Sequence, residues 1–203
     1  GASLILGFMI TAAVISMWVM NTATTIMLLP IGLAVITVVK ETVRGLSLKE
    51  TENFQLALLL GIAYGATIGG MSTLIGTGPN GMLAAFMADN YDLEISFVDW
   101  MKVGVPLSVV MLPACWVILT RIIYPVKFQT SQETTDLLSS MKNDLGDLKG
   151  PEMKILIVFV FTAFAWMFRT VLDDIPFLNG LSDSGIAMIS ALFLFLLPSG
   201  HKE

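Results

Sequence analysis

MNTATT, residues 20–25, interrupts an apolar run, residues 1–39, that carries no charged side chain. A straight crossing of a bilayer needs only about 20 apolar residues, so this run is too long for one membrane-spanning helix. A single crossing would also place the polar groups in the middle of the lipid, where they are most costly. Backbone that is not helical at membrane depth is tolerated only where it lines a protein cavity. We therefore predict that residues 1–40 form a re-entrant helical hairpin with a polar tip.

The composition is that of an integral membrane protein. Hydrophobic residues make up 55% of the chain and charged residues 13%, whereas about a quarter of the residues in a soluble domain are charged. The net charge is -5, and no dense group of Lys and Arg indicates a nucleic-acid partner. Cys115 is the single cysteine, which excludes an internal disulfide and a thiolate metal site. The expected surroundings are a lipid bilayer, in an all-α polytopic fold.

A second uncharged run also exceeds one crossing, and its interior contains GTGPN, residues 76–80. Pro79 lacks a backbone donor, and the residue before a proline is pushed away from the α region. We predict a broken transmembrane helix over residues 56–90. Before the break, glycines recur every four residues at Gly61, Gly65 and Gly69; such a stripe lets another helix approach closely.

The rest of the chain alternates between polar connectors and apolar spans. All Lys and Arg residues except Lys102 and Arg169 fall on the side of the connectors, which the positive-inside rule makes cytoplasmic. Trp100, at the end of an acidic loop on the other side, is typical of an interfacial anchor. The predicted segments are a cytoplasmic connector at 41–55, transmembrane helices at 103–124, 155–172 and 184–199, and a cytoplasmic loop at 125–154 with a surface helix at 132–148.

Two broken helices favour a binding site for ions. At each break, one half-helix ends with free carbonyls that attract a cation, and the next begins with free N–H groups that attract an anion. The neutral side chains at the breaks add donors and acceptors: Asn21, Thr22, Thr24, Thr25, Ser72, Thr73, Thr77 and Asn80. We predict that a cation such as sodium and a carboxylate bind there as neighbours.

Other functional classes are less consistent with these residues. The one histidine, His201, lies in the terminal tail, and the apolar runs hold no base, nucleophile or metal ligand in a catalytic arrangement, so we do not expect an enzyme. An anion channel or a purely structural helical bundle is the alternative from another class. A structural bundle gives no reason for polar breaks at membrane depth.

The motifs resemble those of a known family. SMWVMNTATT (16–25) followed by LPIG (29–32) is similar to the first hairpin of the divalent anion/sodium symporters, the sodium-coupled dicarboxylate and citrate transporters. GIAYGATIGG (61–70) and GTGPN (76–80) resemble the broken helix that follows in that family. The resemblance implies secondary active transport of di- or tricarboxylates such as succinate, malate or citrate, coupled to sodium, by an elevator-type movement. It also implies a homodimer in the plasma membrane, in bacteria the inner membrane.

The resemblance also implies roles for particular residues. Asn21 and Thr22 would contact a substrate carboxylate, and the substrate-binding set is completed by Thr77, Pro79 and Asn80. Sodium would be held by Ser16, Asn21 and Gly76, with no other cofactor. Met20 stands where the family has a tip serine, and Gly78 where it has the first of two prolines, so the exact substrate, and sodium symport against sodium-independent exchange, stay open.

The family contains two inverted repeats, each with a hairpin and a broken helix. This sequence contains one such set, followed by spans that lead towards the expected second hairpin. It begins and ends within or next to apolar segments, and we expect it to be a piece of a longer transporter that supplies the other half of the binding site.

Overall fold

The computed structural model describes residues 1–43, 45–128, 136, 140, 150–173 and 182–197, and the regular secondary structure in this part of the chain is all helical. The chain divides into two compact units, residues 1–144 and 145–203. The helices of the first unit are α1 (Ala2–Ser16), α2 (Asn21–Thr42), α3 (Leu48–Gly70), α4 (Gly78–Tyr91), α5 (Phe97–Val117) and η1 (Ile118–Ile123). Those of the second are α7 (Gly150–Met167), α8 (Arg169–Asp173) and α9 (Asp183–Leu196).

Four helices in the described residues are long and apolar enough to cross a membrane: α2, α3, α5 with η1, and α7. The helices α1 and α9 are apolar but shorter. These lengths and compositions confirm the predicted all-α, polytopic membrane fold.

The starts of α3 and α5 are encoded by capping residues. The Ser47 hydroxyl accepts a hydrogen bond from the Glu50 N–H (3.2 Å), and the Glu50 carboxylate accepts one from the Ser47 N–H (3.1 Å), which forms a capping box. The helix α3 therefore begins at Leu48, inside the segment 41–55 expected to be a connector. In the same way, Ser96 accepts from the Asp99 N–H (3.1 Å), so α5 begins at Phe97, several residues before the apolar span expected from 103.

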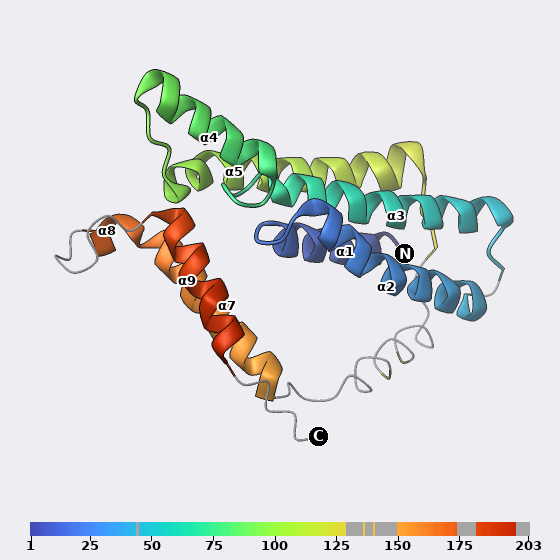
Figure 1. Ribbon diagram of the computed structural model, residues 1–203. Helices are drawn as coiled ribbons and strands as arrows, with labels where there is room; N and C mark the ends of the chain where they lie inside the picture. The colour runs from blue at the N-terminus through green and yellow to red at the C-terminus, as the bar shows by residue number, and fades with distance from the viewer. Residues whose placement is uncertain (44, 129–135, 137–139, 141–149, 174–181, 198–203) are drawn as a thin grey trace. The chain divides into compact units, whose positions relative to one another are not determined.

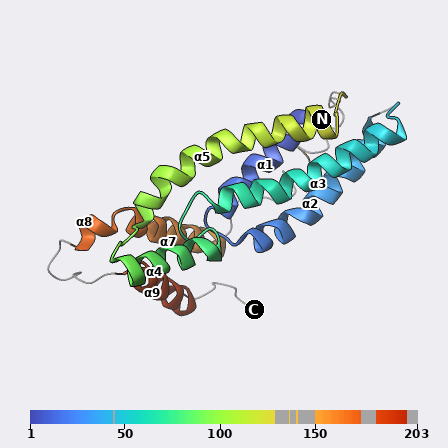
Figure 2. The same ribbon diagram turned by 90° about the horizontal axis from the view of Figure 1, so that it is seen from above.

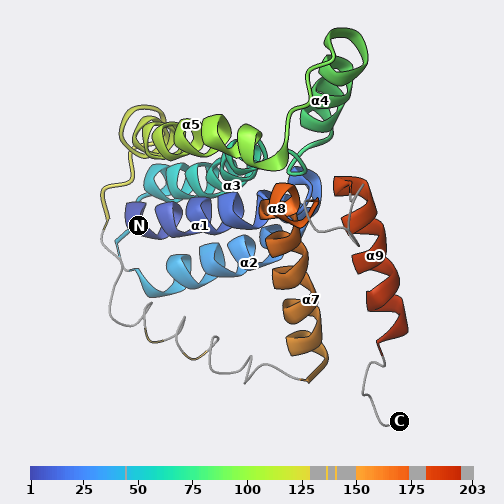
Figure 3. The same cartoon turned by 90° about the vertical axis from the view of Figure 1, so that its left-hand side faces the viewer.

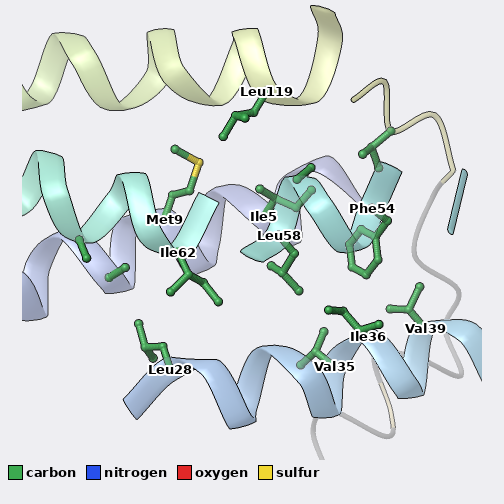
Figure 4. Close-up of a cluster of buried hydrophobic side chains, with 14 residues drawn as sticks. Ile5, Met9, Leu28, Val35, Ile36, Val39, Phe54, Leu58, Ile62 and Leu119 are labelled. Carbon is green, nitrogen blue, oxygen red and sulfur yellow. The ribbon is translucent and has the colours of Figure 1, made fainter. Parts of the chain in front are cut away.

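The first unit is a layered bundle in which α5, α3, α1 and α2 lie side by side (Figures 2 and 3). The helices α1 and α2 run antiparallel on either side of the turn 17–20 (Figure 1). The core between α1, α2 and α3 is built from aliphatic side chains, Met9 and Phe54, with Leu119 of η1 beside it (Figure 4). The helix α4 leaves the bundle, and Asn80 is its one buried residue.

The predicted glycine stripe is the contact between α3 and α1. A Cβ on Gly65 would lie 2.7 Å from the carbonyl oxygen of Met9, and one on Gly69 would overlap the carbonyl oxygen of Ala13. Only hydrogen at these positions lets the two backbones lie this close, so the sequence prediction of close helix approach is confirmed.

The second unit pairs α7 with α9. The Thr162 hydroxyl donates to the Ser190 hydroxyl (2.8 Å) between the two helices, and the Trp166 indole N–H donates to the carbonyl of Asp183 (3.0 Å). Polar contacts of this kind join helices in a membrane, where burial of apolar surface gives little drive. The surface helix expected at 132–148 lies, apart from 136 and 140, outside the described residues.

Candidate functional site

Both helix interruptions lie at the same end of the bundle (Figures 1 and 3). One is the turn 17–20 between α1 and α2, and the other is the segment 71–77 between α3 and α4. They are joined directly, because the buried Thr73 hydroxyl donates a hydrogen bond to the carbonyl of Met17. Residues 16–21 and 70–80 together are called the tip–break site below.

Ser16 and Asn21 meet across the turn of the hairpin. The Ser16 hydroxyl, at the buried end of α1, donates to Oδ1 of Asn21 at 2.8 Å. Asn21 begins α2, and its amide lies against α3: a Cβ on Gly70 would overlap Asn21 Oδ1 and would lie 3.1 Å from Asn21 Nδ2. Gly70 therefore leaves room for the Asn21 side chain, which the family resemblance predicts to contact both the sodium ion and the substrate.

Gly76 is the point where backbone carbonyls from both breaks converge. A Cβ on this residue would overlap the carbonyl oxygen of Gly70 and lie 2.9 Å from that of Ser16. The Gly76 N–H is held by the Thr73 hydroxyl at 3.1 Å. One carbonyl from the end of α1 and one from the end of α3 thus approach a common position.

Asn80 fixes the second break from the side of α4. Its Nδ2 donates to the carbonyls of Gly70 (3.0 Å) and Thr73 (2.8 Å). The side chain therefore satisfies the end of α3 with a donor from the helix that follows, as buried carbonyls require. Thr77 is the N-cap residue of α4 in extended conformation.

The structure thus brings Ser16, Asn21, Gly76 and Asn80 into one cluster, in which Asn21 is half-buried and the other three are buried. Thr22 and Pro79 are exposed, in the first turns of α2 and α4, and Thr77 is half-buried beside Pro79. These three lie at the rim, where a ligand larger than a single ion would reach them.

The electrostatic character of the site comes from main-chain dipoles and neutral side chains. The carbonyl ends of α1 and α3 and the N–H ends of α2 and α4 all face this end of the bundle. In the described residues, no group of three or more His, Cys, Asp and Glu is placed to hold a metal ion. A cation at the tip–break site would be held by backbone carbonyls and by amide and hydroxyl oxygens, and an anion by the helix N-termini.

Sequence reasoning missed the role of α5 at this site. The Trp100 indole N–H, which the sequence favoured as an interfacial anchor, donates to the carbonyl of Met71 at 3.0 Å. The Ser108 hydroxyl donates to the carbonyl of Ile68 (2.8 Å) and accepts from the Ser72 hydroxyl (2.7 Å). Trp100, Gly104 and Ser108 recur every four residues, and this spacing is the signal that could have placed them on one helix face.

A family model described as citrate transporter matches residues 1–201. The chain belongs to the citrate transporter family. The match confirms the resemblance to the dicarboxylate and citrate transporters, which was based on the hairpin and broken-helix motifs. The long apolar helices agree with a multi-pass membrane protein.

Two curated relatives of this member of the citrate transporter family come from staphylococci. The chain is 38% identical over 202 residues to the sodium-dependent dicarboxylate transporter SdcS of Staphylococcus saprophyticus, an alignment that covers 98% of this chain. It is 31% identical over 206 residues to SdcS of Staphylococcus aureus strain USA300, covering 100% of this chain. In both cases the chain spans 39% of the relative's length.

Proposed function

We propose that the chain supplies one half of the binding site of a sodium-coupled secondary transporter for di- and tricarboxylates of the succinate, malate and citrate class. The observation that carries the proposal is the convergence of the Ser16 and Gly70 carbonyls at Gly76, where the two breaks meet. Membership of the citrate transporter family and the similarity to sodium-dependent dicarboxylate transporters support the ion and the substrate class. No covalent chemistry is required of any residue, so the protein acts as a carrier and not as an enzyme.

Sodium binds at the buried part of the tip–break site. Its ligands are oxygens of Ser16 at the end of α1, of Asn21 at the start of α2 and of Gly76 in the second break. Carbonyl ends of interrupted helices are the groups that coordinate sodium in other transporters with broken helices. Because these ligands are neutral, the ion brings a positive charge to the site.

The substrate carboxylate binds on the rim next to this charge. Asn21 and Thr22 at the start of α2, and Thr77 and Pro79 at the start of α4, lie where helix N-termini present N–H groups. Asn80 shapes the same pocket by holding the Gly70 and Thr73 carbonyls. The cation and the carboxylate then stabilise each other as neighbours, which is the physical basis of coupling.

The remaining architecture follows the family. The hairpin of α1 and α2 enters and leaves the bilayer on the cytoplasmic side, with its tip at membrane depth. The longer relatives leave room for a second hairpin and broken helix that complete the site. The protein works as a homodimer in the plasma membrane, and the hairpin-bearing part carries the site across the membrane in an elevator-type movement.

Replacing Asn21 by Ala tests this function. In proteoliposomes that contain the full-length protein, succinate or citrate uptake should saturate with substrate, and Asn21→Ala should lower it by about tenfold or more, since a buried ligand set loses a hydrogen-bonding amide. The matched control is Asn90→Ala, because Asn90 lies on an exposed face of α4 and donates to the Phe86 carbonyl of its own helix. Conductance that does not saturate would indicate a channel, and uptake unchanged in Asn21→Ala would remove Asn21 from the site.

Sodium-independent exchange of dicarboxylates is the second candidate, and Met20 favours it. This residue occupies the N-cap position of α2 with its side chain exposed and making no cap hydrogen bond, and a thioether is a poor ligand for a hard cation. For a symporter, replacement of sodium by choline should abolish uptake. Unchanged uptake in choline, with acceleration by dicarboxylate inside the vesicles, would identify an exchanger.

A further inference from the structure

The carbonyls at the end of α3 point to different partners: some accept hydrogen bonds from α5, and one accepts from α4. A helix leaves its last carbonyls without intrahelical donors, and buried carbonyls must be satisfied by other groups. The carbonyls of Ile68 and Met71 are taken by Ser108 and Trp100 of α5. The Gly70 carbonyl, which lies between them in sequence, is turned to Asn80 and Gly76 instead.

The helix α5 lies directly against the second break. A Cβ on Gly104, between Trp100 and Ser108 on the same face, would lie 2.7 Å from the carbonyl oxygens of both Met71 and Ser72. The buried Ser108 hydroxyl donates to the Ile68 carbonyl at the end of α3 and accepts from the Ser72 hydroxyl in the break. Backbone contact at Gly104 and hydrogen bonds on either side of it fix how segment 71–77 is oriented.

From these contacts we propose that Trp100 and Ser108 are positioning residues of the tip–break site. They hold the Ile68 and Met71 carbonyls on the α5 side, so that the Gly70 carbonyl points to the position shared with the Ser16 carbonyl. Neither residue touches the ion or the substrate. This inference rests on the proposed function, since it assigns residues that set the affinity of the same site.

The test compares two tryptophans on α5 that make the same kind of hydrogen bond. Trp100→Phe keeps the ring and removes the donor to Met71. Trp116→Phe does the same at the other end of α1, where the Trp116 indole N–H donates to the Ala2 carbonyl at 2.9 Å. In full-length protein in proteoliposomes, Trp100→Phe should raise the sodium concentration for half-maximal succinate uptake by about five- to tenfold, the effect expected of a buried carbonyl that loses its partner. Trp116→Phe should leave that concentration unchanged.

Ser108 provides a second variant that changes less volume. Ser108→Ala should shift the sodium half-saturation concentration in the same direction, and Ser108→Thr, which keeps the hydroxyl, should restore it. A purely structural role would lower the melting temperature of the purified protein and the maximal rate without moving this concentration. If Trp100→Phe fails to fold, the comparison of Ser108→Ala with Ser108→Thr decides whether α5 sets the sodium half-saturation concentration.

The outcomes separate this inference from the proposed function. If wild-type uptake does not depend on sodium, sodium coupling fails, and the same variants are then compared by their half-saturation concentration for succinate. Wild-type uptake that depends on sodium allows the positioning role to be tested. If the sodium half-saturation concentrations of Trp100→Phe and Ser108→Ala are both within about twofold of the wild-type value, the shift is smaller than the loss of such a hydrogen bond predicts, and the positioning role is overturned. A shift in Trp116→Phe as large as that in Trp100→Phe would also overturn it.

Discussion

Gly76→Ala should reduce sodium-dependent succinate uptake to about one hundredth of the wild-type rate or less. The added Cβ would overlap the Gly70 carbonyl oxygen and would lie 2.8 Å from the Gly70 Cα and 2.9 Å from the Ser16 carbonyl oxygen. All three are backbone atoms, so no flexible side chain can move aside. A misplacement of about 1 Å at a binding constellation is enough to cost on the order of a hundredfold.

The matched control lies five residues further along, on α4 and outside the tip–break site. A Cβ on Gly81 would meet nothing within 4 Å, so Gly81→Ala should transport at close to the wild-type rate. Uptake is measured in proteoliposomes with equal amounts of each variant, and the melting temperature is recorded to compare folding. Wild-type transport by Gly76→Ala would show that the carbonyls meeting at this residue do not form the ion site.

Gly69→Ala should have the largest effect on stability. Its Cβ would overlap the carbonyl oxygen of Ala13 on α1, so α1 and α3 must separate along the whole glycine stripe. Overpacking of a tight contact costs about 1–3 kcal/mol of folding stability and occasionally more. Because the atom that the new Cβ meets belongs to the backbone and cannot move aside, we expect Gly69→Ala to lose about 3 kcal/mol. The melting temperature of the purified full-length protein should fall, and uptake should fall with it because both breaks are displaced.

Gly7→Ala is the control for this variant. Gly7 lies on α1, and a Cβ there would meet nothing within 4 Å. Alanine favours a helix over glycine by about 1 kcal/mol, so this variant should melt at the same temperature as the wild type or higher. A Gly69→Ala protein as stable as Gly7→Ala would contradict the close packing of α1 on α3.

The interruptions of the helices could be predicted from sequence because they depend on local chemistry. The cluster at 20–25 and the motif GTGPN mark the turn 17–20 and the segment 71–77. Helix starts were harder to predict from hydropathy. The helices α3 and α5 begin in polar sequence, at caps formed by Ser47 and Ser96, and a hydropathy scan places the start only where the apolar residues begin.

The composition of the site was only partly predictable. Ser16, Asn21, Gly76 and Asn80 could be predicted as site residues because they lie in or next to the two interrupted segments, and the structure brings them close together. Trp100 and Ser108 lie in an ordinary apolar span, and one sequence does not reveal which face of a helix meets a particular turn. Their contribution depends on the packing of α5 against α3, which is a tertiary contact.

The interlocked backbones of Ala13 and Gly69 also bear on the energetics of binding. Because neither helix can slide along the other without a steric collision, the two groups of carbonyls keep their separation before an ion arrives. A sodium ion that binds as proposed would then meet preformed ligands and would spend little of its binding free energy on ordering the protein. This rigidity would let uncharged ligands hold the ion tightly without a carboxylate.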